Sequence, residues 1–158
     1  MTTLTMATAD DTRAVGRRLG ERLGAGDLVV LAGGLGAGKT TMTQGIGEGL
    51  GIRGPVTSPT FVIARAHPSL VGGAALVHVD AYRLGGSAEL DDLDLDTDLT
   101  QSVTIVEWGS GLVEELSPDR LELTLTADPA TESRMLDLVG RGRWAERVDE
   151  LVAHLEGR

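Results

Sequence analysis

Residues 27–40 of the chain read DLVVLAGGLGAGKT, an apolar run followed by a glycine-rich turn and a lysine. The apolar run, 27–32, is bounded by glycines, which is typical of a short buried strand. After the turn at 33–38, residues 39–50 repeat apolar side chains at helical spacing until Gly51, which predicts a helix that stops there. The segment therefore predicts a strand and a helix joined by a tight turn, an arrangement that presents a helix N-terminus to an anion.

The turn and the start of the helix match the phosphate-binding pattern G-x-x-x-x-G-K-[ST], here Gly33 to Thr40. Glycines let backbone N–H groups point at a phosphate that side chains would otherwise block. We expect the Lys39 ammonium to reach the β- and γ-phosphates and the Thr40 hydroxyl to bind Mg²⁺. Lys39 is the single lysine among 14 basic residues. This suggests a position where the planar fork of an arginine would not serve.

A site of this kind also needs a carboxylate near the metal, at the end of an apolar strand. Two candidates are present, because Asp80 ends the run ALVHVD and Glu107 ends the run VTIVE. Spacing alone does not distinguish between them. Guanine-selective proteins of this class usually carry an N/T-K-x-D motif, which needs a second lysine, so the sequence favours ATP over GTP.

The composition bounds the remaining possibilities. With 158 residues, 41% of them apolar, the chain fits one globular domain. The absence of cysteine excludes disulfides, thiol catalysis and cysteine-ligated zinc. We expect a cytoplasmic protein without membrane contact, because no run approaches the roughly 20 apolar residues of a membrane span and the N-terminus does not resemble a signal peptide. The net charge of −10 argues against strong nucleic-acid binding by this chain alone.

The other elements follow from hydrophobic periodicity. We expect a helix capped by Asp10 or Asp11 that runs to about Leu23, and a final amphipathic helix over 142–156 with Trp144 in the core. Strands are predicted over 61–66, 74–80, 103–108, 121–126 and 135–139. The first two are candidates for a hairpin. The alternation of strands and helices predicts an α/β fold with a mixed, mostly parallel sheet flanked by helices.

Four segments together resemble the TsaE family (also called YjeE), the P-loop ATPase of bacterial threonylcarbamoyladenosine (t6A) tRNA modification. They are, in chain order, 35–41 (LGAGKTT), 58–60 (SPT), 78–84 (HVDAYRL) and 107–108 (EW). The resemblance covers about residues 8–140 and implies a single domain of the P-loop NTPase type over 1–158. The departures from the family pattern, such as Gly34 in place of an acidic residue and Gly109 in place of a proline, remove no phosphate or metal ligand.

The resemblance implies a site for ATP or ADP with Mg²⁺. It implies nucleotide contacts from Gly36, Ala37, Gly38, Lys39, Thr40, Thr41, Thr60 and Trp108. Thr40 and Glu107 would hold Mg²⁺, and Asp80 would act beside the γ-phosphate, so that Lys39, Asp80 and Glu107 are the candidate catalytic residues. Arg134 is a further candidate that could approach the nucleotide from the late part of the sheet.

The partners implied by the resemblance are the TsaD and TsaB proteins, which make t6A at adenosine 37 of tRNAs that read ANN codons. The ATPase would reset that complex between turnovers and would meet tRNA only through it. Two other functions are compatible with the phosphate motif. One is a small-molecule kinase with Arg65 and Arg83 as substrate clamps, for which the chain leaves little room, and the other is a docking module that binds ATP without hydrolysing it.

Two further features have competing interpretations. The acidic run over 89–98 is either a solvated face or a docking surface for a basic partner. His78 alternates with Leu76 and Asp80 along its strand, and we expect it to be packed or hydrogen-bonded rather than catalytic.

Overall fold

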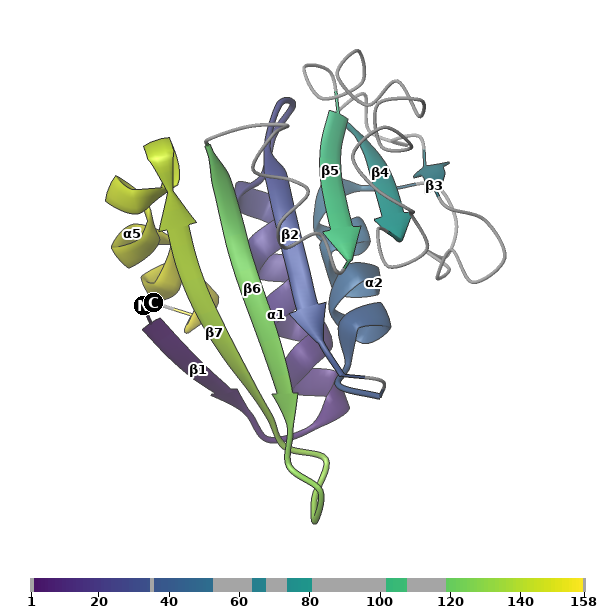
Figure 1. Ribbon diagram of the computed structural model, residues 1–158, viewed down its shortest axis with the longest axis vertical. Helices are drawn as coiled ribbons and strands as arrows, with labels where there is room; N and C mark the ends of the chain where they lie inside the picture. Colours follow the sequence, from purple (N-terminus) through teal and green to yellow (C-terminus); the bar gives the residue numbers. More distant parts are fainter. Residues whose placement is uncertain are drawn as a thin grey trace.

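The computed structural model describes residues 2–34, 36–52, 64–67, 74–80, 102–107 and 119–157. Its elements are β1 (Thr2–Met6), α1 (Ala9–Arg22), β2 (Leu28–Gly33), α2 (Lys39–Leu50), β3 (Ala64–His67), β4 (Ala75–Asp80), β5 (Ser102–Glu107), β6 (Arg120–Ala127), β7 (Arg134–Arg141), the 3₁₀-helix η3 (Gly142–Glu146) and α5 (Val148–Leu155). The described strands form one seven-stranded sheet in the order β1-β7-β6-β2-β5-β4-β3 (Figure 1).

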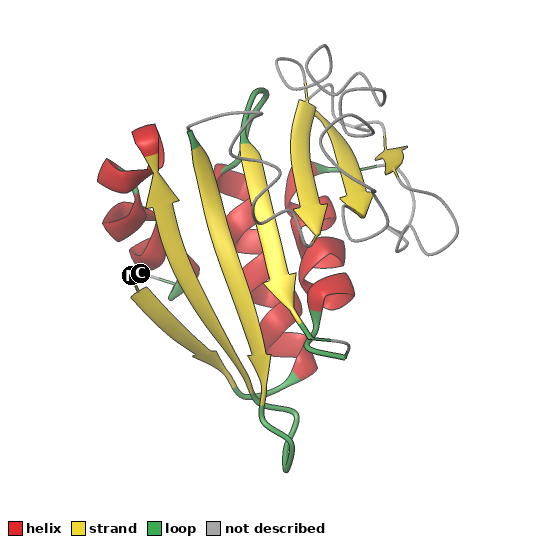
Figure 2. Ribbon diagram, in the orientation of Figure 1, coloured by secondary structure: helices red, strands yellow, loops and turns green. Residues whose placement is uncertain are grey.

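The centre of the sheet consists of four parallel strands, β6, β2, β5 and β4. The strands β7 and β3 run antiparallel to their neighbours, and β1 pairs antiparallel with β7, as the strand arrows in Figure 2 show. Five of the seven strands, β1 and the central four, thus point the same way, which confirms the predicted mixed, mostly parallel sheet. The proposed hairpin agrees with the antiparallel pairing of β3 and β4. Parallel central strands place their carboxyl ends, and the turn after β2, at one edge of the sheet.

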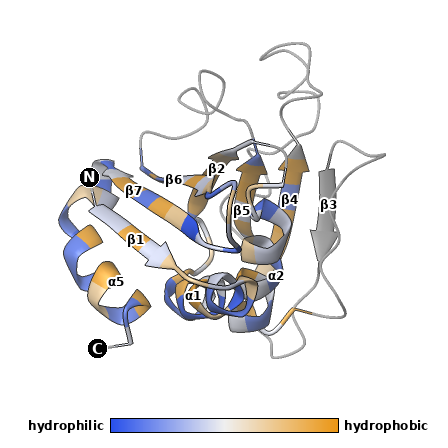
Figure 3. Cartoon of the chain, turned by 90° about the horizontal axis from the view of Figure 1, so that it is seen from below, coloured by the Kyte–Doolittle hydropathy of each residue, from blue (hydrophilic) through white to orange (hydrophobic). Residues whose placement is uncertain are grey.

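The helices α1, α2 and α5 lie on one face of the sheet, with α1 and α2 side by side and α5 next to α1 (Figure 3). The helix predicted over 39–50 is confirmed with the same bounds, and its apolar repeat points into the core. This core, between the helices and the sheet, includes the fully buried Leu19, Val29, Met42, Ile46, Ile105, Leu121 and Leu138. No helix in the described part of the chain is long and apolar enough to cross a bilayer.

Four glycines bring α1 and α2 into direct backbone contact. Gly16 and Gly20 of α1 face Gly45 and Gly49 of α2. A Cβ atom on any of the four would lie under 3.0 Å from a backbone atom of the other helix. The two helices run in the same direction (Figure 1). Their close approach is therefore possible only because these positions carry no side chain. We call these four residues the glycine contact.

An ion pair spans the edge of the same helix pair. Arg13 of α1 binds the carboxylate of Glu48 on α2. The hydrogen bond and the charge of Glu48 raise the pKa of Arg13. Both side chains are exposed, so the pair contributes little to stability compared with the buried contact beside it.

Three features of the fold differ from the sequence predictions. The helix α1 is capped by Thr8 instead of Asp10 or Asp11: the Thr8 hydroxyl accepts the Asp11 N–H, and the Asp11 carboxylate accepts the Thr8 N–H. This is a capping box, in which the acidic residue belongs at the third helical position. The strand β1 was not predicted, although its threonines are β-branched residues that suit an edge strand.

The third difference concerns the final helix, predicted as one unit over 142–156. The structure divides it into η3 and α5, with Arg147 between them. Gly142 has a φ of +61°, and the Arg147 N–H donates to the Trp144 carbonyl, so the first turn is 3₁₀. Trp144 is 3% exposed, which confirms its place in the core.

Candidate nucleotide-binding site

The glycine turn leaves the N-terminus of α2 open. Gly38 is the N-cap residue in the left-handed conformation, with a φ of +103°, and no side chain of the described residues caps the helix. Gly36 also has a positive φ, +76°, and faces open space. The Ala37 N–H donates to the Gly34 carbonyl at 3.1 Å and holds the turn closed. No described side chain caps the start of α2, which is the arrangement that the motif predicts for an anion site.

Lys39 folds back over this turn. Its Nζ donates to the carbonyl oxygen of Gly33 at 2.9 Å, and the side chain is half-buried. The Thr43 hydroxyl donates to the Lys39 carbonyl at 2.8 Å, which ties the first turn of the helix together. The ammonium is therefore held at the turn, where it would meet the phosphates of a nucleotide.

Arg134 reaches the turn from β7, almost a hundred residues further along the chain. One guanidinium nitrogen donates to the Gly36 carbonyl at 3.3 Å, and another donates to the Ser133 carbonyl at 3.0 Å. The Arg134 Nε lies 3.6 Å from the point where a Cβ of Gly38 would be. The structure thus places two cationic side chains, Lys39 and Arg134, against the same turn.

A small pocket adjoins the turn on the side of α1. It is lined by Ala9, Thr12, Gly38, Thr41, Glu132 and Arg134. Thr41 belongs to the motif and Arg134 was a candidate, but Ala9, Thr12 and Glu132 were not predicted. These residues come from the start of α1 and from the β6–β7 connection, and no spacing in the sequence relates them to the turn.

Glu107 ends β5 at the same edge of the sheet. It pairs with Leu31 of β2, two residues before Gly33, and on its other side with Asp80 of β4. The backbones of the two candidate carboxylate residues thus lie side by side on adjacent strands, next to the turn. The Glu107 side chain is 7% exposed, and its Oε2 lies 3.5 Å from the Nε2 of His78. The side chain of Asp80 is outside the described part.

The donors at this edge suit Mg²⁺ better than a soft metal. The Thr40 side chain is exposed on the first turn of α2, and the Glu107 carboxylate is at the end of β5. Hydroxyl and carboxylate oxygens are the hard ligands that Mg²⁺ prefers, usually completed by substrate phosphates and water. Within the described residues, no three His, Asp or Glu side chains gather into a metal site.

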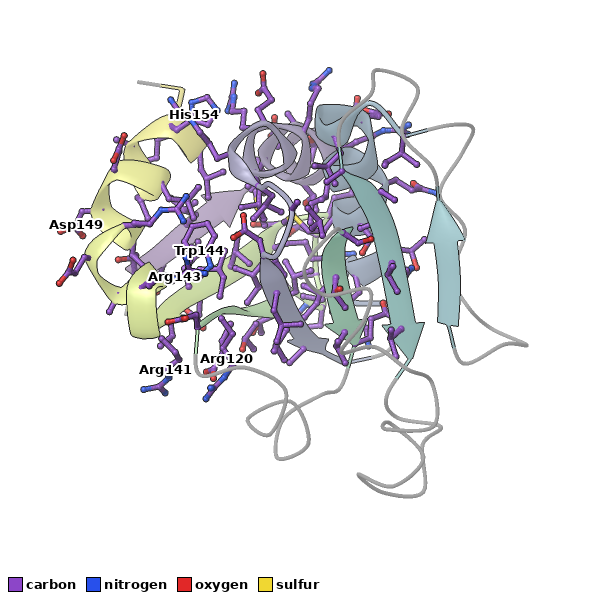
Figure 4. The ribbon with its side chains drawn as sticks, turned by 90° about the horizontal axis from the view of Figure 1, so that it is seen from above. Arg120, Arg141, Arg143, Trp144, Asp149 and His154 are labelled. Carbon is purple, nitrogen blue, oxygen red and sulfur yellow. The ribbon has the colours of Figure 1, made fainter. Side chains whose placement is uncertain are left out.

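Three arginines at the other end of the sheet are paired with acids. Figure 4 shows Arg120, Arg141 and Arg143 together at the end of β6 and β7 that lies away from Arg134. Glu122 lies 2.9 Å from Arg120 and 3.6 Å from Arg141, and Asp119 lies 3.2 Å from Arg143. These arginines are remote from the turn and supply matched controls for charge changes at the site.

Several predicted site features lie outside the described residues. They are Thr60 and the segment 58–60, Arg83, the acidic run over 89–98, and Trp108. Their roles stay predictions.

The chain is similar to known proteins over most of its length. The family model described as threonylcarbamoyl adenosine biosynthesis protein TsaE matches residues 6–136. A tRNA threonylcarbamoyladenosine biosynthesis protein TsaE from Streptomyces coelicolor is 62% identical over 138 residues, which is 84% of this chain and 93% of the relative. The protein of that name from Bacillus subtilis is 35% identical over 146 residues, 92% of this chain and 90% of the relative.

The fold is also similar to a solved structure. The crystal structure of Bacillus subtilis YdiB superposes with a TM-score of 0.73 at 29% sequence identity. The superposition covers 97% of this chain and 95% of that one. The α/β fold predicted from the sequence is therefore confirmed by the sheet and by this neighbour.

Proposed function

Because the chain belongs to the TsaE family, which takes part in t6A biosynthesis in tRNA, we propose that it is a Mg²⁺-dependent ATPase that serves this modification. The observation that carries the proposal is the turn between β2 and α2. There the Lys39 ammonium lies on the Gly33 carbonyl, beside an uncapped helix N-terminus. Phosphate is the anion that this combination of N–H groups and ammonium recognises.

The nucleotide is bound through its phosphates. The backbone of Gly36, Ala37 and Gly38 and the first turn of α2 would hold the β-phosphate, for which the Ala37 N–H would exchange its bond to the Gly34 carbonyl for one to the phosphate. Lys39 would neutralise the β- and γ-phosphates. ATP and ADP are the expected ligands. Arg134, held against Gly36, supplies a second positive charge at the rim of the turn.

Thr40 and Glu107 are the proposed Mg²⁺ ligands. When bound, the metal neutralises charge on the phosphate oxygens and orients them. A buried carboxylate at the end of β5 and an exposed hydroxyl on α2 supply two oxygen donors at one edge of the sheet.

Asp80 is proposed to act in the hydrolytic step, by orienting the attacking water or the metal's water shell beside the γ-phosphate. Its backbone pairs with Glu107, which supports a shared site with divided roles. Thr60 is proposed to sense the γ-phosphate, and Trp108, directly after Glu107, to complete the nucleotide site.

The proposed partners are TsaD and TsaB, in the cytoplasm. In this proposal the ATPase resets their complex between rounds of t6A formation at adenosine 37 of tRNAs that read ANN codons. The chain would meet tRNA only through that complex. The net charge of −10 supports an indirect contact, because an acidic surface repels a phosphate backbone.

The test is steady-state phosphate release by wild type, Lys39→Ala and Arg143→Ala, with folding checked by circular dichroism. Arg143 is a matched cation at the far end of the sheet. We expect Lys39→Ala to lose nearly all hydrolysis while Arg143→Ala keeps it. A folded Lys39→Ala protein that hydrolyses ATP at the wild-type rate would contradict the proposal. Wild type that binds ATP without releasing phosphate would be a docking module, and phosphoryl transfer to an added metabolite would indicate a kinase.

A further inference from the structure

His78 is a buried histidine whose ring touches the proposed metal site without belonging to it. We propose that His78 is a positioning residue, which donates its Nε2–H to Oε2 of Glu107 and so holds that carboxylate in the orientation that binds Mg²⁺. This inference rests on the proposed function, because it assigns Glu107 as a metal ligand. It adds a residue whose effect on the metal passes entirely through another side chain.

The first argument is burial without a partner. The His78 side chain is 0% exposed, and neither ring nitrogen has a hydrogen-bond partner among the described residues. Buried polar atoms are almost always hydrogen-bonded, so an exception in a well-packed strand calls for an explanation. An apolar residue would fill this position without burying a polar atom, as Leu76 does two residues earlier on the same strand.

The second argument is geometry. His78 on β4 pairs with Ile105 on β5, and Glu107 follows two residues later, so both side chains lie on the same face of the sheet. The Nε2 of His78 is 3.5 Å from the Oε2 of Glu107, at ion-pair distance. N–H···O hydrogen bonds have lengths of about 2.7–3.2 Å, so a small rotation of the Glu107 side chain closes the bond. Hydrogen bonds at active sites are often long in the ligand-free state and tighten in the complex.

The third argument is chemical. Carboxylates that bind metals are themselves usually held by a hydrogen bond from a neighbouring group, and the loss of such a partner weakens metal binding about 10- to 100-fold. Mg²⁺ demands near-ideal ligand geometry, so it is sensitive to a carboxylate that swings. Among the described residues, His78 is the basic side chain paired with Glu107.

The experiment compares three substitutions at His78 with one matched control. His78→Gln keeps a donor near the Nε2 position, whereas His78→Asn and His78→Leu do not. The control is Thr104→Val, which removes another fully buried, unpartnered polar atom from the opposite face of β5. Each variant is titrated with Mg²⁺ while binding of a fluorescent ATP analogue is followed, and the titration is repeated in EDTA. Thermal unfolding reports stability separately.

We expect His78→Leu and His78→Asn to shift the Mg²⁺ midpoint upward about 10- to 100-fold, with binding in EDTA unchanged. His78→Gln should recover much of this shift, and Thr104→Val should match wild type. A purely structural role predicts a different result, in which all variants lower the unfolding temperature and none moves the Mg²⁺ midpoint. That result would overturn the inference. If one His78 variant fails to fold, the remaining variants still give the comparison.

A second readout does not depend on activity. The chain has three histidines, so the ring nitrogens of His78 can be resolved by ¹⁵N NMR in the full-length protein. We expect a proton on Nε2, and a change in its shift in Glu107→Gln. A neutral ring protonated only on Nδ1, both with and without Mg²⁺ and nucleotide, would also overturn the inference.

These outcomes separate the inference from the proposed function. If wild type binds the nucleotide with no Mg²⁺ dependence, the proposed Mg²⁺-dependent function fails and the inference fails with it. If wild type shows the dependence but Glu107→Ala keeps it in full, Glu107 is not a metal ligand, and the inference fails while the proposed ATPase function stands. If wild type and Glu107→Ala behave as expected while His78→Leu matches wild type, only the positioning role is wrong.

Discussion

Replacing Gly45 with alanine tests whether the glycine contact sets the distance between α1 and α2. In an open helix this change stabilises by about 1 kcal/mol, because alanine has the higher helix propensity. Here the new Cβ would lie 2.2 Å from the carbonyl oxygen of Arg13, whereas ordinary van der Waals contact begins at 3.4 Å. The obstacle is backbone, which cannot rotate away as a side chain can. The helices must therefore separate.

The loss of stability in Gly45→Ala follows from the packing that is disturbed when the helices separate. Moving α2 away from α1 disturbs the packing of Leu19, Met42 and Ile46, all fully buried beneath the contact. Overpacking of this kind costs about 1–3 kcal/mol. Set against the gain in propensity of about 1 kcal/mol, it should leave Gly45→Ala destabilised by up to roughly 2 kcal/mol. Adding Gly20→Ala should cost less than the sum of the two single changes, because helices already apart accommodate the second methyl group.

Urea unfolding followed by circular dichroism measures this directly. We expect the midpoint of Gly45→Ala to fall at an unchanged m value. Gly24→Ala is the control, since a Cβ there meets nothing within 4 Å, and it should match or slightly exceed wild type. If Gly45→Ala is as stable as Gly24→Ala, the separation of the helices is not limited by these glycines and the reasoning fails.

Three further predictions concern the site. Lys39→Arg should lose most phosphate release, as Lys39→Ala does, because the guanidinium fork is too wide for the turn; near-normal release would contradict this. Glu107→Ala should weaken Mg²⁺-dependent ATP binding, and Glu107→Asp should have an intermediate effect. Asp80→Asn should bind ATP but hydrolyse it poorly. Mg²⁺ titrations of ATP binding and turnover in these variants would reveal whether the roles of Glu107 and Asp80 are reversed. Hydrolysis by the isolated chain should be slow, and its rate should change when TsaD and TsaB are added. In enzymes of this class, a catalytic group contributed by a partner protein raises the hydrolysis rate about 10³- to 10⁵-fold. Fast turnover unaffected by partners would argue against it.

Prediction from the sequence worked best where the information is local. The bounds of α2 agree with the structure because Gly38 and Gly51 mark both ends and the apolar repeat fills the interval. The cap of α1 was misplaced because Thr8, Asp10 and Asp11 are all suitable cap residues, and the choice depends on the reciprocal hydrogen bonds of one capping box. The division of the final helix into η3 and α5 depends on the turn at Gly142, and the spacing of apolar residues does not show that turn.

The same distinction applies to the candidate site. Lys39 and Thr40 are part of one continuous motif, so their placement beside the turn follows from eight residues of sequence. The adjacency of Asp80 and Glu107 depends instead on strand order, which the spacing did not determine. Thr12 and Glu132 reach the pocket through β-sheet pairing and helix packing, so they leave no sequence signal.

The N-termini of α1 and α2 point toward the same edge of the sheet but are completed in different ways. The first turn of α1 contains its own counter-charge, Asp10 and Asp11, whereas that of α2 contains no acidic residue. The positive end of the α2 dipole therefore has no acidic residue of the helix's own first turn beside it and would be stabilised by an anion from solution. An anion that binds only the folded chain adds stability that grows with the logarithm of its concentration, about 2.7 kcal/mol at a hundred times its dissociation constant. An anion bound at this edge would act as the missing part of a helix cap, and the stability of the fold would then depend on the concentration of that ligand.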